Sequence, residues 1–323
     1  MILVLLEMED GTVSEVSLES LTFARSLSAS GGGVPVDAVA VGELPGEAVS
    51  VLASYGVRDV HHATGDGFSS YSAAAWASAV QDAHARTGAV VLMAAGTNRG
   101  CEVLAHVAAR AGVAMAANVV SFQGLAPFVV DRQVVGGQVV EEMLLDDRPA
   151  VFTVAGHAVE ATPAETPGAA TVEEHPLEVS AADLVGRAVR TVPRPAGEGA
   201  DLKSARVVVG AGRGAGGPDG FGPCLELAEL LGGSLGVSRV VTSLGWRPHH
   251  EQVGQTGTRI SPEVYIPCGI SGAIQHWAGC ASSKVIVAIN TDAEAPMVTK
   301  ATYAVIGDMH EVVPAVVERL QGR

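Results

Sequence analysis

The residues of this sequence that could bind a ligand lie mostly in its last third, directly after predicted β-strands. Polar or glycine residues follow five apolar runs, namely RVVVG, SLGV, VYIPCG, KVIVAI and TYAVIG. In doubly wound parallel sheets, ligands bind outside the carboxyl ends of the strands. Any one of these turns has the composition of an ordinary loop. Their recurrence after five strands indicates a ligand site in the region from Arg206 to Arg323.

The first of these strand ends carries a glycine-rich loop. Residues 212–217 read GRGAGG, which satisfies GxGxxG before a helix expected to start near Asp219. Glycines let backbone N–H groups approach a pyrophosphate, and a helix N-terminus attracts negative charge. The pattern alone is weak, because a chain with 39 glycines produces it by chance. Nicotinamide binding also requires an acid about 20 positions further on. Ser238 and Arg239 stand there, which disfavours NAD but leaves a phosphate-bearing ligand, with Arg213 as a further phosphate partner.

Two polar loops follow along the chain. Residues 252–257 read QVGQTG, and residues 269–276 read GISGAIQH. Ser271 is expected to cap a helix on which Gly272 and His276 share one face, with space for a ligand at the glycine. A capped helix with a surface histidine explains the second loop equally well. Ser271 is not expected to be a hydrolase nucleophile, because the GxSxG pattern is missing.

A metal centre is not expected from these patterns. The four cysteines are far apart and form no CxxC pair, which argues against a zinc site or a disulfide framework and fits a reducing cytosol. His249 and His250 are adjacent, so their side chains project differently, and no third ligand with suitable spacing is evident.

The elements that position these loops come from an alternation of short apolar runs and helical patterns, which indicates parallel sheets covered by helices. Expected strands are 2–6, 36–41, 90–94 and 150–154, with helices at 16–27, 72–85 and 102–110. Residues 128–130 and 138–143 are expected to form a hairpin about Gly136 and Gly137. A Pro- and Gly-rich segment at 191–203 predicts a linker. The predicted fold is α/β, with two parallel-sheet domains of Rossmann or flavodoxin type at 1–195 and 203–323.

Composition excludes several classes of partner. The chain has 323 residues, of which 48% are hydrophobic and 17% charged, and its 35 acidic residues exceed its 20 basic ones. Such a negative field repels phosphate backbones and anionic lipids, so neither nucleic acid nor a membrane surface is an expected partner. The first residues, MILVLLEMEDG, are expected to form a strand rather than a signal peptide. No run approaches the about 20 apolar residues that span a bilayer, and the expected location is cytoplasmic.

The last 120 or so residues carry a specific resemblance. The strings GRGAGGPDGF, SR, QVGQTG, PEVYIPCGISGAIQH, SKVIVAIN, DAEAP and DMHEVVP occur in order and with the spacing of the alpha subunits of electron-transfer flavoproteins. The first 190 or so residues resemble that family more loosely. The resemblance implies an alpha/beta heterodimer in which the C-terminal domain of this chain binds FAD.

The resemblance also implies which residues contact FAD. The matching positions are Arg213, Ser238, Arg239, Val253, Gly254, Gln255, Thr256, Ser271, Gly272, Ala273, Ile274, Gln275, His276, Asn290 and Asp308. It implies that Arg213 meets the phosphates, that Arg239 lies by the isoalloxazine, and that the Thr256 hydroxyl reaches flavin N5. It places His276 at the pyrimidine carbonyl of the flavin, and Asn290 and Asp308 at the adenosine. An arginine and an imidazole near flavin N1 would stabilise the reduced cofactor and raise its potential.

The resemblance predicts an electron carrier rather than an enzyme with its own substrate. Its expected partners are the beta subunit, a flavin-dependent dehydrogenase as donor, and a quinone reductase or similar acceptor. One alternative is an FAD- or NAD-linked oxidoreductase with its own small-molecule substrate, which the missing ribose acid and acid/base pair disfavour. Another is a nucleotide-binding enzyme that uses the first domain, where residues 96–100 (GTNRG) only weakly resemble a phosphate loop. A purely structural partner subunit would not need polar strand ends.

Overall fold

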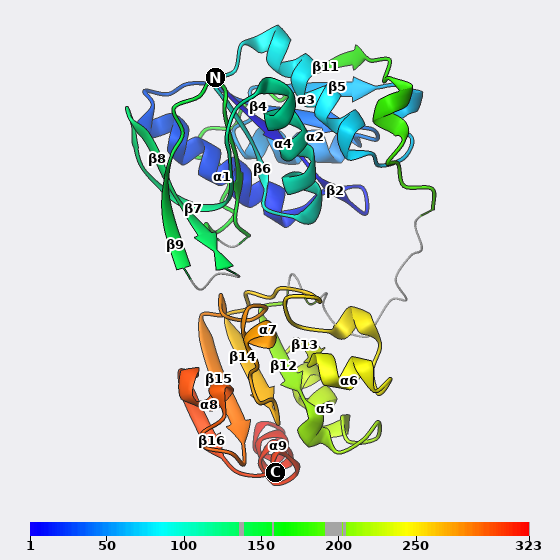
Figure 1. Ribbon diagram of the computed structural model, residues 1–323, viewed down its shortest axis with the longest axis vertical. Coiled ribbons are helices and arrows are strands. Elements are labelled where there is room, and N and C mark those ends of the chain that lie inside the picture. The colour runs from blue at the N-terminus through cyan, green and yellow to red at the C-terminus, as the bar shows by residue number, and fades with distance from the viewer. Residues whose placement is uncertain (136–138, 157, 191–201, 203–204, 323) are drawn as a thin grey trace. The chain divides into compact units, whose positions relative to one another are not determined.

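The computed structural model describes residues 1–135, 139–156, 158–190, 202 and 205–322. The chain divides into two compact units, shown in Figure 1. The first comprises Met1–Val134 and Val140–Pro193, and the second is built mainly on Arg194–Arg323. Both have parallel sheets with helices, so the predicted α/β class is confirmed. The predicted linker at 191–203 lies outside the described residues except for Leu202, and the exact domain limits remain predictions.

The first unit alternates strands and helices as expected. Its strands are β1 (Ile2–Leu5), β2 (Met8–Glu9), β3 (Thr12–Val13), β4 (Val36–Val41), β5 (Asp59–Thr64), β6 (Val91–Ala95), β7 (Met115–Leu125), β8 (Phe128–Val134), β9 (Val139–Leu144), β10 (Ala150–Val154) and β11 (Thr171–Pro176). Its helices are α1 (Glu15–Ser30), α2 (Gly46–Ser54), α3 (Ala73–Thr87) and α4 (Asn98–Ala111). The main sheet has the order β11-β5-β4-β1-β6-β10-β7-β8-β9 and is parallel from β11 to β7.

Alternation of side chains along the strands gives this sheet two buried faces. Ile2 and Val4 pack in a core with α1 and α2, whereas Leu3 and Leu5 pack on the other face with α3 and α4. The central strands β1 and β6 are therefore apolar at every position, as expected for a sheet covered on both sides.

The unpredicted elements of this unit have sequences without a clear period. β5 reads DVHHAT and buries its histidines, β7 is half-buried along its length, and β11 is an exposed edge strand. α2 is also absent from the sequence prediction. The expected hairpin is confirmed as far as strand pairing goes, because β8 and β9 are neighbours in the sheet. Its turn at residues 136–137 lies outside the described residues.

The second unit is a five-stranded, fully parallel sheet of order β13-β12-β14-β15-β16. Its strands are β12 (Val207–Ala211), β13 (Ser234–Val237), β14 (Val264–Cys268), β15 (Val285–Asn290) and β16 (Tyr303–Ile306). Its helices are α5 (Gly222–Leu230), α6 (Arg239–Ser243), α7 (Ile274–Trp277), α8 (Pro296–Lys300) and α9 (Met309–Leu320). The order places a topological switch point between β12 and β14, where successive connections leave on opposite sides.

One face of this second sheet is covered by α5 and α9, whose residues Leu227 and Val313 pack on Val209. The other face packs Tyr265 and Met297 with the loop before β14. α5 begins at Gly222, later than the predicted start near Asp219, because a 3₁₀ turn at Arg213–Ala215 and a loop come first. Within the described residues, no helix of either unit is both long and apolar enough to cross a membrane.

Candidate functional site

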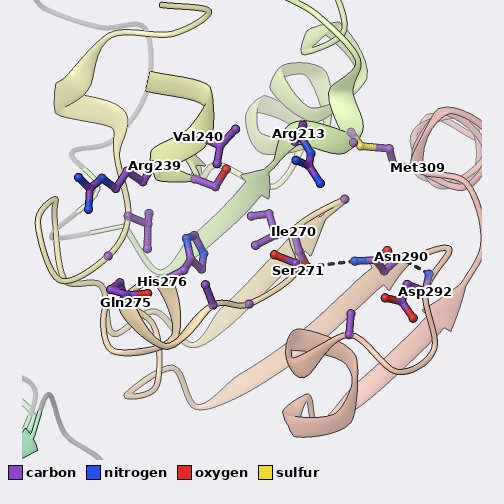
Figure 2. Close-up of a pocket in the computed structure, with 18 of the residues that line it drawn as sticks. Arg213, Arg239, Val240, Ile270, Ser271, Gln275, His276, Asn290, Asp292 and Met309 are labelled. Carbon is purple, nitrogen blue, oxygen red and sulfur yellow. Dashed lines mark hydrogen bonds between the residues drawn. The ribbon is translucent and has the colours of Figure 1, made fainter. Parts of the chain in front are cut away.

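A cavity of about 770 Å³ lies in the second unit along the carboxyl ends of its strands (Figure 2). Its wall includes residues at or just after the ends of all five strands. The loops that follow β12 and β14 part at the switch point and open a crevice there. The volume falls within the range of about 300–1,000 Å³ that is typical of small-molecule and cofactor sites.

Fourteen of the fifteen predicted contact residues line this cavity. They are Arg213, Ser238, Arg239, Val253, Gly254, Gln255, Thr256, Ser271, Gly272, Ala273, Gln275, His276, Asn290 and Asp308. The exception is Ile274, whose side chain is 67% exposed and is not part of the wall. The sequence thus predicted which segments meet here. The contact of each residue with a bound molecule remains a prediction.

Three glycines bring the loops after β12 and β14 into direct backbone contact. The N–H of Gly212 donates to the Cys268 carbonyl at 3.0 Å, and that of Gly214 donates to the Gly269 carbonyl at 3.2 Å. A Cβ atom on Gly212 would lie 2.2 Å from the Gly269 carbonyl oxygen, which is far inside contact distance. Gly269 also has a φ of +62°, a conformation that favours glycine. The first two glycines of the GxGxxG pattern are therefore required by loop packing.

Two arginines enter the cavity wall from different elements. Arg213 lies in the turn after β12, and Arg239 is the first residue of α6, after Ser238 as N-cap. Neither guanidinium forms an ion pair or hydrogen bond with any residue that the structure describes. The chain as a whole carries a net charge of −15. Two unpaired cations in one cavity of such a chain attract an anionic ligand.

The Thr256 hydroxyl is held by a chain of side-chain hydrogen bonds. Gln252 is buried, and its Nε2 donates to Thr256 Oγ1 at 3.0 Å. Its Oε1 accepts from the Thr242 hydroxyl of α6 at 2.6 Å. The Gln252 amide occupies a lone pair of the Thr256 oxygen. The Thr256 hydroxyl hydrogen is therefore directed away from that amide and is available for donation to a ligand.

His276 is a buried histidine in the same wall. Its Nε2 lies 2.8 Å from the hydroxyl of the fully buried Tyr265. Its Nδ1 is buried and has no hydrogen-bond partner among the described residues. Burial lowers the pKa of His276 from 6.5 to about 4. The imidazole is therefore neutral at pH 7, and a ligand hydrogen bond would relieve the cost of the unpaired nitrogen.

The loop after β14 does not start a helix where the sequence predicted one. α7 begins at Ile274 with Ala273 as N-cap, so the predicted N-cap role of Ser271 is wrong. The cause is Gly272, which has a φ of +78° and whose Cβ position lies 2.5 Å from the Met297 nitrogen. A left-handed residue cannot belong to a right-handed helix. The N–H groups of residues 271–273 form no hydrogen bond within the described part of the chain. Free consecutive N–H groups bind anions and carbonyl oxygens.

The far end of the cavity is built by the ends of β15 and β16. Asn290 donates from Nδ2 to the Ile270 carbonyl at 3.0 Å and accepts at Oδ1 from the N–H of Asp292 at 3.1 Å. Asp308 caps α9, and one of its oxygens accepts from the N–H of His310 at 2.9 Å. These bonds fix the loops that follow β15 and β16. They leave some polar atoms of the Asn290 and Asp308 side chains available to a ligand in the cavity.

Thirteen further wall residues are not among the predicted contacts. They are Gly214, Val240, Ser243, Leu244, Gln252, Gly269, Ile270, Thr291, Asp292, Ala295, Gly307, Met309 and His310. Most are apolar or glycine, and such types carry no chemical signal in a sequence. Gln252 directly precedes the predicted segment 253–256, and His310 lies two residues after Asp308; this nearness in sequence is the signal that could have identified them.

Comparison with known proteins identifies the family that has this site. Residues 2–180 match the model described as electron transfer flavoprotein domain, and residues 201–281 match that of the electron transfer flavoprotein FAD-binding domain. The chain belongs to the electron-transfer flavoprotein alpha subunits. It is 38% identical to the alpha subunit of Mycobacterium leprae, with 99% of this chain and 98% of the relative aligned. Identity is 31% to the alpha subunit of Bacillus subtilis (99% and 97% aligned) and 34% to the mitochondrial alpha subunit of Arabidopsis thaliana (98% and 89% aligned).

The cofactor of this electron-transfer flavoprotein subunit is FAD, since the matched FAD-binding domain covers the strands and loops from β12 to α7. The residues present fit such a group. Its phosphates and flavin carbonyls are hydrogen-bond acceptors, and the wall offers unpaired guanidinium groups, free backbone N–H groups and an unpartnered ring nitrogen. The predicted preference for a phosphate-bearing ligand other than NAD agrees with this family.

Proposed function

We propose that this chain is the alpha subunit of a two-subunit electron carrier that accepts electrons from a flavin-dependent dehydrogenase. We further propose that it delivers them to a downstream acceptor such as a quinone reductase and turns over no substrate of its own. The observation that carries this proposal is the cavity at the switch point, whose two arginines have no anionic partner among the described residues. The names of the relatives, all electron-transfer flavoprotein alpha subunits, support the carrier role.

The order of groups along the cavity supports an extended FAD. Figure 2 shows Arg239 and His276 toward one end, Arg213 in the middle, and Asn290 and Asp292 toward the other end. Flavin, pyrophosphate and adenosine follow one another in the same way in the cofactor. In the proposed arrangement the first pair meets the flavin, the central arginine meets the phosphates, and the asparagine end meets the adenosine.

FAD, when bound, supplies the group that gains and loses electrons. The residues of the chain bind and orient it. Arg239 supplies a guanidinium, a cation that favours negative charge beside it. His276 contributes a neutral ring nitrogen, and Gln252 fixes the direction of the Thr256 hydroxyl. Together these groups tune the affinity for the oxidised and reduced forms of the cofactor.

Exposed apolar side chains beside this end of the cavity support a protein partner. Val240 is 43% exposed, Leu244 53% and Ile274 67%. Apolar groups left in water next to a polar site favour contact with another protein. In the proposal this partner is the beta subunit, which would complete the surroundings of the flavin and shield it from water.

The test is to coexpress the chain with its beta subunit and to record the visible spectrum of the purified complex. A carrier shows bound flavin that is bleached by a flavin-dependent dehydrogenase with its substrate and is reoxidised by a quinone reductase. The same complex without the dehydrogenase should consume none of a panel of acyl-CoA, hydroxy-acid and amine substrates. Substrate turnover by the complex alone would refute the carrier proposal and favour an oxidoreductase with its own substrate.

A further inference from the structure

Three potential metal ligands meet at the sheet edge of the first unit. His61 lies on β5, and Glu173 and His175 lie on the neighbouring edge strand β11. The parallel register places Glu173 opposite His61, and His175, two residues further on, points to the same face of the sheet. His61 and His175 are 114 residues apart in the sequence, so only strand pairing brings them together.

The three ligand atoms have the separations of a metal-binding set. His61 Nδ1 lies 3.3 Å from His175 Nε2 and 3.6 Å from Glu173 Oε2, and that oxygen lies 3.7 Å from His175 Nε2. Atoms at these separations share a centre about 2.05 Å from each, and zinc binds imidazole nitrogen and carboxylate oxygen at about 2.0–2.2 Å. The three separations are therefore compatible with one bound ion, and the two nearly parallel imidazole rings, whose nitrogens face each other, turn toward it on binding.

A buried carboxylate orients the first of these ligands. Asp37 on β4 is fully buried, and its Oδ2 lies 3.3 Å from His61 Nε2. Arg58 holds the same carboxylate with two hydrogen bonds, at 3.0 and 2.7 Å. A carboxylate that accepts the outer N–H of a histidine fixes the tautomer in which the other nitrogen is free to bind a metal. That other nitrogen is Nδ1, which faces the cluster.

The charge and accessibility of the cluster suit a cation. The Glu173 side chain is 50% exposed and forms no ion pair with a lysine or arginine in the described part of the chain. Arg86 acts on this charge through space, but its guanidinium is ion-paired with Asp82 and forms no direct bond to Glu173. Two imidazoles and one carboxylate favour zinc, cobalt, nickel or copper over magnesium and calcium, which prefer oxygen ligands alone. The edge position leaves room for water as a further ligand.

We propose that His61, Glu173 and His175 bind one divalent transition-metal ion of the zinc class, with water completing its coordination. The ion links β11 to β5 and so fixes the edge strand of the first sheet. The competing account is a hydrogen bond between the two imidazoles with no affinity for metal.

The test uses the full-length, untagged chain in complex with its beta subunit. Co²⁺ is titrated and followed by its visible absorption, and Zn²⁺ affinity is measured by competition with a chromophoric chelator. The variants are Glu173→Gln, which is isosteric and exposed, and His175→Ala. The matched control is Glu174→Gln, the next residue of the same strand, whose side chain points to the opposite face. Circular dichroism and FAD content show that each variant is folded.

We expect one Co²⁺ per complex, and Zn²⁺ affinity lower by more than about tenfold in both ligand variants, since even groups that only support a ligand contribute about 10–100-fold. The control should bind as the wild type does. Zn²⁺ should also raise the unfolding temperature of the wild type and the control but not of Glu173→Gln. Less than one equivalent bound, or affinity unchanged in both ligand variants, would overturn the proposal.

Discussion

The buried imidazole of His276 should make the stability of the FAD-free chain depend on pH in a calculable way. Its folded-state pKa of about 4 lies below the ordinary value of 6.5, because burial disfavours the charged ring. As the pH falls through 6.5, the unfolded chain takes up a proton at this residue and the folded chain does not. The unfolded state is then favoured, so stability falls with acidification between pH 6.5 and 4 and is unaffected by this residue above that window.

The magnitude follows from the two values. Each unit of pKa difference corresponds to about 1.36 kcal/mol. The lowering of the His276 pKa from 6.5 to about 4 therefore corresponds to a total loss of about 3 kcal/mol in the free energy of unfolding at low pH. Between pH 7 and pH 5, about 2 kcal/mol of this should already be lost. That is a large share of the typical stability of about 5–15 kcal/mol for a domain, so the effect is measurable.

The assay is urea unfolding of the FAD-free chain at pH 7 and pH 5, followed by tryptophan fluorescence. His276→Gln is the informative variant, because its amide can reach the Tyr265 hydroxyl but does not titrate. The control is His310→Gln, which replaces an exposed histidine of the same cavity wall. The wild type and the control should lose about 2 kcal/mol more than His276→Gln on going from pH 7 to pH 5. Equal losses in all three proteins would refute the assignment of a neutral, buried imidazole.

Three further predictions concern the cofactor site. Arg239→Ala should retain FAD but lower its one-electron potential by about 65–130 mV, which corresponds to about 1.5–3 kcal/mol for a hydrogen bond to a charged group. Redox titration measures this potential. Arg239→Lys should restore only part of it, because a point charge does not replace the planar guanidinium. Asp308→Ala should lower the FAD content after gel filtration without changing the potential, and Asp308→Asn, which preserves the helix cap, separates loss of the carboxylate from loss of α9 stability. Gly212→Ala should destabilise the second unit by about 1–3 kcal/mol and reduce FAD content, because the new Cβ atom meets the Gly269 carbonyl. In the control Gly217→Ala the new Cβ atom has nothing within 4 Å, so this variant should behave as the wild type in urea unfolding.

The position of the candidate site could be predicted from sequence because it depends on a rule that needs no tertiary detail. Parallel strands place their carboxyl ends at one edge, so residues that follow separate strands, such as Arg213 and Asn290, must converge. The same reasoning does not give local conformation. Ser271 has the residue type of an N-cap, but the left-handed Gly272 next to it delays the helix, and that φ is set by packing against Met297. Ile274, which the resemblance places among the contacts, is exposed and not part of the wall.

The pairing of β11 with β5 could not be predicted. β11 has no periodic pattern and pairs with β5 across more than a hundred residues, so the neighbourhood of His61 and His175 has no sequence signal. The two strands read DVHHAT and TVEEHP, and their polar residues argue locally against burial. The buried Asp37 on β4, held by Arg58, makes a polar neighbour for the histidine and explains why it is tolerated inside the sheet.

The first unit has a switch point as well, and its polar groups differ from those of the second. There β1 lies between β4 and β6, so the loops that follow β1 and β6 also part at the carboxyl edge. Glu7, which follows β1, is buried, and its carboxylate accepts a hydrogen bond from Thr97, whose hydroxyl oxygen also accepts from the Gly100 N–H at the start of α4. In the GTNRG loop at residues 96–100, the Thr97 hydroxyl and the N–H groups of Gly96 and Gly100 are therefore paired within the chain. At the switch point of the second unit, arginines and backbone N–H groups have no such partners among the described residues. The first crevice thus presents a buried carboxylate where the second presents two arginines, and the second therefore favours an anionic ligand.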